Sequence, residues 1–246
     1  MTVVVYGASS VIGGAVVDAF LAKGRNVVAA DHFPFPAMLK NHPALESGNS
    51  RLSLLACKDM QDESFDFVNF FSRCEAAGAG PVHTLVCVAP PVGHKSVLDL
   101  TAADIRGVVD LELVVPALLM QEAARRMTAN GGGRIIVFCS MSAKTGVHTL
   151  VAPYAAAKGG LLSYMRTMAA ELAMHGVTVN GIATSLFEPQ VAGLSDEERA
   201  DLTQGIPARR FGKPSEAADA ALYLASESAA YITGETLNLS GGRFMD

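Results

Sequence analysis

Short apolar runs alternate with helix-period segments along most of the chain, and this rhythm constrains the fold more than any other feature. The predicted strands are 3–6, 26–30, 51–56, 84–88, 134–139, 178–182 and 236–239, and the predicted helices are 11–23, 62–77, 102–128, 154–175 and 215–226. Most of these strands are continuously apolar, as in a parallel sheet covered on both faces. Repeated β-α units imply right-handed crossovers. The pattern therefore predicts an α/β fold with a doubly wound parallel sheet and helices on both faces.

The bulk composition is that of one domain. The chain has 246 residues, 50% of them hydrophobic, which is enough to bury one substantial core. We find no linker, low-complexity tract or internal repeat in the sequence. We therefore expect a single domain over residues 1–246.

Charge and cysteine usage argue against several classes of protein. The formal net charge is -5 without a basic run, which disfavours a nucleic-acid partner. The four cysteines lack metal-ligand spacing, so we expect reduced thiols and no metal. No signal peptide is recognisable and no apolar stretch is long enough to span a bilayer. These features predict a cytoplasmic protein without a membrane partner.

A glycine-containing turn, residues 7–13, lies between the first predicted strand and the first predicted helix. Gly7 permits a tight turn, and the backbone N–H groups of a helix N-terminus favour a pyrophosphate. Asp31 ends the second predicted strand, where a carboxylate can accept hydrogen bonds from an adenosine ribose and repel a 2′-phosphate. The alternative for Asp31 is an ordinary polar strand exit. Together the turn and Asp31 predict a Rossmann-type site for NAD.

Tyr154 and Lys158 are separated by three alanines, and Ser140 lies upstream. Alanine favours a helix, and a four-residue spacing places the phenol and the ammonium on one helix face. A neighbouring cation favours the phenolate, so we expect a lowered Tyr154 pKa and a tyrosine able to exchange a proton with a substrate oxygen. The alternative is a tyrosine at a helix start beside a solvated lysine.

With these residues in place, the chain resembles a single-domain short-chain dehydrogenase/reductase over residues 3–242. The matching segments are the turn 7–13, Asp59-Met60-Gln61-Asp62, the set Ser140, Tyr154 and Lys158, Val179-Asn180-Gly181-Ile182, the helix entry 207–217, and the C-terminal segment 232–242. The resemblance implies an NAD(H)-dependent oxidoreductase that interconverts a secondary alcohol and a ketone, with a small-molecule substrate.

The resemblance also implies a role for each matched residue. Tyr154 would donate or accept the proton, Lys158 would lower the Tyr154 pKa and hold the nicotinamide ribose, and Ser140 would bind the substrate oxygen. The implied cofactor-binding residues are Gly7, Ser9, Ser10, Ile12, Gly13, Asp31, Asp59, Met60, Ala89, Tyr154 and Lys158.

Several positions around the cofactor depart from the family pattern. Tyr6 and Val11 replace a threonine and a glycine, and the sequence Cys87-Val88-Ala89-Pro90 replaces Asn-Asn-Ala-Gly. Pro90 fixes its own φ and lacks an N–H, which changes the wall beside the cofactor ribose. Thr184-Ser185 replaces the usual Pro-Gly. We expect a narrower cofactor pocket than in typical members.

Two further departures concern the catalytic set itself. Glu112 aligns with the family's catalytic asparagine, where a carboxylate could hold a water or pair with Lys158 and weaken its effect on Tyr154. Ser140 precedes Tyr154 by fourteen positions, one more than usual, and Ser142 is the alternative catalytic serine. We prefer Ser140 because it closes the predicted strand 134–139.

Two other functions therefore stay open beside the oxidoreductase. A halohydrin dehalogenase-like lyase would keep the serine and tyrosine and bind no nicotinamide, but that group has arginine where this chain has Lys158. A non-catalytic or regulatory family member would keep the fold, with or without the nucleotide.

Two segments bear on assembly and substrate access. Residues 108–120 are apolar almost all round, and the helix 154–175 has apolar residues on several faces, so we expect a homo-oligomer, either a tetramer or a dimer. Residues 186–210 interrupt the β-α rhythm, which predicts a lid over the substrate site. Candidate substrate contacts are Ser142, Phe187 and Val191; a solvated surface excursion is the alternative.

Overall fold

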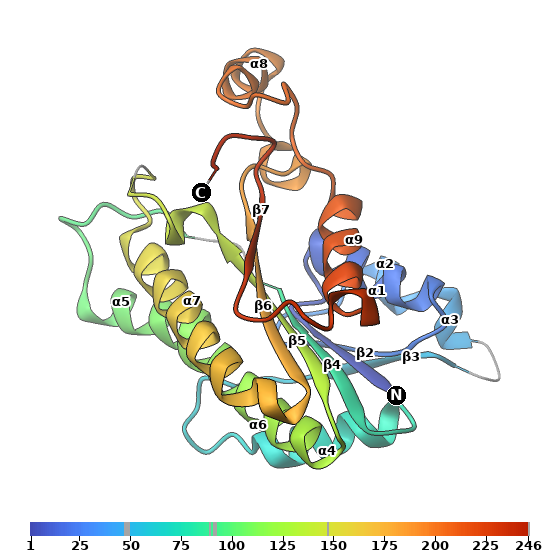
Figure 1. Cartoon of the computed structure of the whole chain (residues 1–246). Coiled ribbons are helices and arrows are strands. Elements are labelled where there is room, and N and C mark those ends of the chain that lie inside the picture. Colours follow the sequence, from blue (N-terminus) through green and yellow to red (C-terminus); the bar gives the residue numbers. More distant parts are fainter. Residues whose placement is uncertain (47–49, 89, 91–92, 147, 246) are drawn as a thin grey trace.

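The computed structural model of this chain describes residues 1–46, 50–88, 90, 93–146 and 148–245. A seven-stranded sheet forms its centre, in the order β3-β2-β1-β4-β5-β6-β7, with parallel pairing between neighbours (Figure 1). The strands are β1 (Thr2–Tyr6), β2 (Asn26–Asp31), β3 (Leu52–Ala56), β4 (Val82–Cys87), β5 (Gly133–Ser140), β6 (Val177–Thr184) and β7 (Thr236–Leu239). The predicted Rossmann-type doubly wound parallel sheet is confirmed.

The α-helices are α1 (Val11–Ala22), α2 (Ala37–Lys40), α3 (Pro43–Glu46), α4 (Phe67–Ala77), α5 (Ala102–Val109), α6 (Val115–Ala129), α7 (Ala152–Leu172), α8 (Asp196–Gln204) and α9 (Pro214–Leu224). The short helices α2 and α3 were not predicted, and two of the five predicted helices differ in extent by more than the ends fray. The helix expected from residue 62 begins at Phe67, because the Asp66 side chain accepts the Asn69 N–H and caps it. The helix expected over 102–128 is divided into α5 and α6 by a π-helix, η1 (Asp110–Val114).

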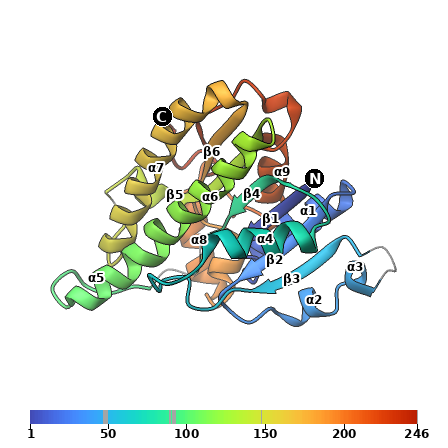
Figure 2. The ribbon, with the colours of Figure 1, turned by 90° about the horizontal axis from the view of Figure 1, so that it is seen from below.

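Two hydrophobic cores lie on the two faces of the sheet and receive alternate side chains of the strands at its centre. On β1, Val4 and Tyr6 pack with residues of α4, α6 and α7, whereas Val3 and Val5 pack with residues of α1 and α9. Figure 2 shows α4, α6 and α7 on one side of the sheet. This arrangement leaves the carboxyl ends of the strands to loops and helix starts.

The chain order in the sheet reverses between β1 and β4, which are hydrogen-bonded neighbours. In doubly wound sheets, ligands bind outside the carboxyl ends of the strands at such a switch point. Tyr6 ends β1 at this place, and the turn into α1 follows it directly.

After β6 the chain leaves the sheet, and α8 projects beyond its carboxyl-terminal edge (Figure 1). Ser195 caps α8, since its hydroxyl accepts the Glu198 N–H while the Glu198 carboxylate accepts the Ser195 N–H. At the base of this excursion, Val191, Ile206 and Phe211 form a small core of their own.

The described residues contain no helix with both the length and the apolar character needed to cross a bilayer. No group of three or more histidine, cysteine or acidic side chains in the same part of the chain is placed to hold a metal ion. All four cysteines of the sequence fall within it, as buried free thiols.

Candidate active site

Tyr154 and Lys158 lie in the first two turns of α7, beside the carboxyl end of β5. Their spacing brings the Lys158 ammonium to 5.8 Å from the centre of the Tyr154 ring. Ser140 is the last residue of β5, and its side chain is hydrogen-bonded to Tyr154. The Ser140 hydroxyl also accepts the Ser142 N–H at 3.1 Å. The structure thus pairs Ser140 with the phenol, and Ser142 supports Ser140 through its backbone.

Lys158 is almost completely enclosed, with 2% of its surface exposed. Its Nζ lies 2.8 Å from Glu112 Oε2 and donates a hydrogen bond of 3.3 Å to the Phe138 carbonyl. Burial by itself would lower the pKa of Lys158, but the Glu112 carboxylate and the neighbouring Tyr154 outweigh it and raise this pKa. Lys158 is therefore a firmly protonated cation.

The Tyr154 phenol has a pKa above its usual value of about 10. Burial is the largest cause; Lys158 opposes it, Glu112 adds to it, and the hydrogen bond from Ser140 opposes it. The expectation that Lys158 lowers the Tyr154 pKa below its usual value is wrong for this structure. The reason is that desolvation and Glu112 together outweigh the ammonium.

The π-helix η1 places Glu112 inside the molecule. Within the five residues of η1 only Glu112 is buried, and α5 before it has no buried residue. A π-turn inserts an extra residue and rotates the side chains that follow, and such turns are frequent at functional sites. The sequence singled out Glu112 by its position, and the usable signal for the π-helix was Pro116, which lies inside the helix expected over 102–128 and lacks the N–H that would bond to the Glu112 carbonyl.

The turn before α1 is closed by two glycines. Gly7 has a φ of +82°, and a Cβ on it would lie 2.3 Å from the Val88 carbonyl oxygen. A Cβ on Gly13 would lie 2.1 Å from the Gly7 oxygen. Neither position has room for a side chain, and at Gly7 the left-handed backbone also requires glycine.

Ser10 caps α1 and leaves two amides at its N-terminus. Its hydroxyl accepts the Gly13 N–H at 3.0 Å and donates to the Gly7 carbonyl at 2.9 Å. The N–H groups of Val11 and Ile12 lie in the first turn, where a helix provides no acceptor of its own. The Val11 side chain, which replaces a glycine of the family pattern, is 56% exposed at this point.

Asp31 ends β2 and ties the turn to the following loop. Its carboxylate accepts the Ser9 N–H at 2.8 Å and the Phe33 N–H at 2.9 Å. The residue is 2% exposed. A carboxylate has about four lone-pair sites, so two of them are left for a further donor.

A cavity of about 230 Å³ opens above the turn, lined by Tyr6, Gly7, Ser9, Ser10, Asp31 and His32 among others. The Tyr6 hydroxyl and His32 Nδ1 are 3.1 Å apart, and the His32 ring packs on Phe33 at 3.9 Å between centres. Sequence reasoning missed His32, although its place directly after Asp31 was a usable signal. A second cavity, of about 570 Å³, is lined by Tyr6, His32, Asp59, Met60 and Leu111 among others.

The remaining predicted residues are placed as follows. Ala89 and Pro91 lie outside the described residues, so their part in the cofactor pocket stays a prediction. Phe187 lines a cavity of about 160 Å³ and packs closely on Gly212. Val191 is almost fully buried in the small core below α8. In this conformation Val191 therefore offers little surface to a substrate.

A family model described as "Enoyl-(Acyl carrier protein) reductase" matches residues 7–243. The chain belongs to the short-chain dehydrogenase/reductase family, and general oxidoreduction is the activity this membership supports.

Two relatives and one solved structure illustrate the similarity. The 3-oxoacyl-(acyl-carrier-protein) reductase FabG of Rickettsia bellii is 29% identical over 250 residues, covering 99% of this chain and 97% of the relative. The corresponding protein of Salmonella typhimurium is 32% identical over 242 residues, covering 98% and 96%. A short-chain type dehydrogenase/reductase from Mycobacterium ulcerans superposes with a TM-score of 0.89 at 25% identity, covering 98% of this chain and 89% of that structure.

Proposed function

We propose that this chain is an NAD(H)-dependent oxidoreductase that interconverts a secondary alcohol and a ketone. The observation that carries the proposal is the convergence of Ser140, Tyr154 and Lys158 at the carboxyl end of β5. The phenol is hydrogen-bonded to a serine and faces a protonated lysine, which is the arrangement a proton-transfer site at a carbonyl oxygen needs.

The residues beside this set fit the adenosine and pyrophosphate half of a nicotinamide dinucleotide. The glycine turn gives close backbone approach, the Val11 and Ile12 amides can meet a pyrophosphate, and Asp31 keeps lone pairs for a ribose. A bound nicotinamide dinucleotide would supply hydride chemistry at the substrate carbon. We assign the cofactor-binding roles to Gly7, Ser9, Ser10, Ile12, Gly13, Asp31, Asp59 and Met60, with Tyr154 and Lys158.

The protein's own part in the reaction is proton transfer and positioning. The Ser140 hydroxyl donates a hydrogen bond to the carbonyl oxygen of the substrate and holds it near the phenol. Tyr154 then gives its proton to that oxygen as the carbonyl carbon gains hydride, or takes the proton back in the reverse direction. Lys158 keeps its positive charge beside the phenol and retains a third donor for a ribose hydroxyl.

The substrate class we favour includes 3-oxoacyl thioesters, since the named relatives are 3-oxoacyl-(acyl-carrier-protein) reductases and such a substrate contains a ketone. For the dinucleotide we favour NAD over NADP, because a buried carboxylate at Asp31 repels a 2′-phosphate. We further propose a single domain, a lid over 186–210 with Ser142 and Phe187 near the substrate, a homo-oligomeric assembly and a cytoplasmic location.

The proposal is tested by titrating the purified protein with NADH and with NADPH, followed by fluorescence transfer to the dihydronicotinamide. We expect saturable NADH binding, weaker NADPH binding, and consumption of NADH on addition of a ketone or a 3-oxoacyl thioester. Absence of binding by both dinucleotides would overturn it. In that case a halide-release assay with vicinal haloalcohols separates a dehalogenase-like lyase from a non-catalytic family member.

A further inference from the structure

We propose that Glu112 is a positioning residue that offsets part of the charge of Lys158 and so keeps Tyr154 protonated at neutral pH, which makes this site a carbonyl reductase in its working direction. This inference rests on the proposed oxidoreductase function and adds the direction of the reaction.

Glu112 lies closer to the Lys158 ammonium than the Tyr154 ring does. Lys158 Nζ is 2.8 Å from Glu112 Oε2 but 5.8 Å from the centre of the Tyr154 ring. Coulomb energy falls with distance, so a carboxylate this close offsets part of the field that the ammonium exerts on the phenol. Lys158 still lowers the Tyr154 pKa more than Glu112 raises it, and burial is the largest cause of the raised pKa. Tyr154 therefore faces a partly compensated cation rather than a free one.

Burial keeps this pairing strong. The side chains of Lys158 and Glu112 are 2% and 4% exposed, so water and dissolved ions screen them little. Water would screen the charges of a pair on the protein surface. An enclosed pair instead fixes the charge beside the phenol over the whole neutral pH range.

Four titratable groups near the pair are uncharged at neutral pH, although the cations Lys144 and Arg166 act on one of them, Cys139, and the Asp31 carboxylate acts on Tyr6 and His32. From β5, burial raises the pKa of the Cys139 thiol to about 11, and from β4 it raises the pKa of Cys87 to about 12. From β1, burial raises the pKa of Tyr6, and burial lowers the pKa of His32 after β2. Ser140, the remaining neighbour of the phenol, carries no charge.

With the ammonium partly compensated, burial of Tyr154 decides its protonation, and its raised pKa agrees with this. A protonated phenol can donate its proton to the carbonyl oxygen during reduction, for which a bound dihydronicotinamide would supply the hydride, and the resulting phenolate regains a proton from water. Alcohol oxidation needs the phenolate from the start. Ketone reduction is therefore favoured below the Tyr154 pKa and is lost as the pH rises through that pKa. The rate of alcohol oxidation increases only above the same pKa.

The test is an ultraviolet difference titration of the phenolate that needs neither cofactor nor turnover. The signal of Tyr154 is obtained by subtracting the spectrum of Tyr154→Phe from that of the unaltered protein, and the same pair is made with Glu112→Gln. We expect no Tyr154 phenolate below about pH 10 in the unaltered protein, and a midpoint lower by about 1–3 pH units with Glu112→Gln. The matched control Glu112→Asp keeps the charge and should titrate nearer the unaltered protein.

Two results would overturn the inference: a Tyr154 midpoint near neutral pH in the unaltered protein, or equal midpoints with and without the Glu112 carboxylate. The first result is available even if Glu112→Gln does not fold. Where NADH binds, the alkaline limb of ketone reduction should move with the phenolate midpoint in each variant, which a merely structural role for Glu112 would not cause. Failure of NADH binding tells against the proposed function and leaves the titration interpretable.

Discussion

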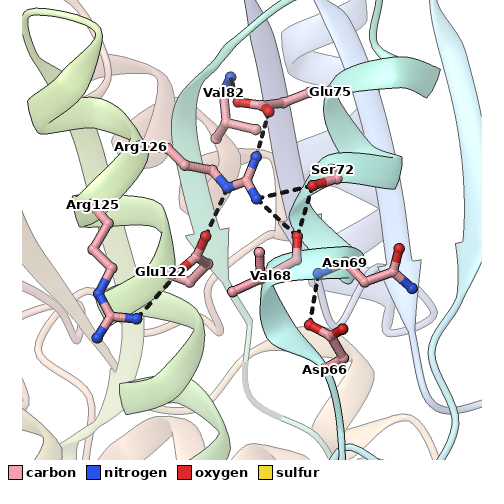
Figure 3. Close-up of polar contacts among 9 residues, drawn as sticks. All are labelled: Asp66, Val68, Asn69, Ser72, Glu75, Val82, Glu122, Arg125 and Arg126. Atoms are coloured by element: carbon pink, nitrogen blue, oxygen red, sulfur yellow. Dashed lines mark hydrogen bonds and ion pairs between the residues drawn. The ribbon is translucent and has the colours of Figure 1, made fainter.

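Arg126 of α6 and Lys158 of α7 are both cations paired with glutamates, but their hydrogen bonding differs. Figure 3 shows the Arg126 guanidinium between α6 and α4. Its Nε donates to Glu122 at 2.9 Å, and its two terminal nitrogens donate to Glu75, to the Val68 carbonyl at 2.8 Å and to Ser72 at 3.1 Å. Every nitrogen of the fork is engaged, so this cluster joins two helices.

The Lys158 pair is less completely bonded. Lys158 has one carboxylate and one carbonyl as partners, and within the described chain Glu112 Oε2 has no partner at hydrogen-bond angles. A buried polar group without its hydrogen bonds costs stability, and such groups gather where function needs them. The Arg126 cluster therefore stabilises the fold, whereas the Lys158 pair sets the protonation of Tyr154 at some cost in stability.

The largest effect on stability is expected at Arg126. Arg126→Met leaves Glu75 and Glu122 without their shared cation. Arg126 and Glu75 are 16% and 25% exposed, so the loss in the free energy of unfolding should be below or at the lower end of the about 3–5 kcal/mol typical of a fully buried pair. Urea unfolding measures it. Arg125→Met is the matched control: that side chain is 64% exposed and lies 3.4 Å from Oε2 of Glu122, so it should cost less than about 1 kcal/mol. Equal losses would contradict the structural role of Arg126.

The next effect concerns replacement of both members of the buried pair, Glu112 and Lys158. Replacing a buried ion pair by apolar residues of similar size is neutral or stabilising by about 1–4 kcal/mol. Glu112→Leu combined with Lys158→Met should therefore unfold at the same or a higher urea concentration, while turnover is lost. Glu112→Leu alone leaves a buried ammonium and should lower stability. A double variant much less stable than the unaltered protein would show that this pair also stabilises the fold.

Gly13 in the cofactor turn and Gly107 in α5 should respond in opposite ways to replacement by alanine. Gly13→Ala places a methyl group 2.1 Å from the Gly7 oxygen, and such overpacking costs about 1–3 kcal/mol. A Cβ on Gly107 in α5 meets nothing within 4 Å, so Gly107→Ala should stabilise by about 0.5–1 kcal/mol through helix propensity. Thermal unfolding of both variants, with NADH titration of each, checks the prediction; a tolerated Gly13→Ala with intact binding would refute the tight turn.

The smallest effect is expected at an exposed pair, Arg210 and Glu216, whose contacts are 2.9 and 2.6 Å. The hydrogen bond from Arg210 lowers the pKa of Glu216 to about 2. A depressed carboxyl pKa contributes stability above the unfolded value of about 4.3, and this contribution is lost as pH falls toward about 2. Both side chains are more than a third exposed, so we expect at most about 1 kcal/mol. Unfolding of Glu216→Gln and of the unaltered protein, compared at about pH 2–3 and at neutral pH, measures the difference.

Much of the fold could be predicted because its signals are local. Continuous apolar runs marked the strands, and β7 was predicted with the bounds it has. The four-residue spacing of Tyr154 and Lys158 placed both on one face of α7 because a helix fixes that geometry wherever it lies. Ser140 was preferred over Ser142 because it closes a strand, and it is the serine that meets the phenol.

The direction of the Tyr154 pKa could not be predicted, because desolvation depends on everything packed around the ring. For Glu112, pairing with Lys158 was one of two alternatives that the sequence offered, and a contact of 2.8 Å between the two side chains is the one found, whereas the burial of Glu112 could not be predicted. That burial follows from the π-helix, for which Pro116 was the usable signal. Spacing within an element is written in the sequence, whereas burial between elements is a property of the assembled fold.

The most direct test of Tyr154 as the proton donor is a single-turnover measurement. The protein is saturated with NADH, mixed with a ketone, and the loss of dihydronicotinamide absorbance is followed for the unaltered chain and for Tyr154→Phe. We predict a rate about 10²–10⁴ times lower in the variant, the usual range for removing a general acid, with unchanged NADH affinity. An equal rate in the two proteins would contradict the assignment of Tyr154 as the acid.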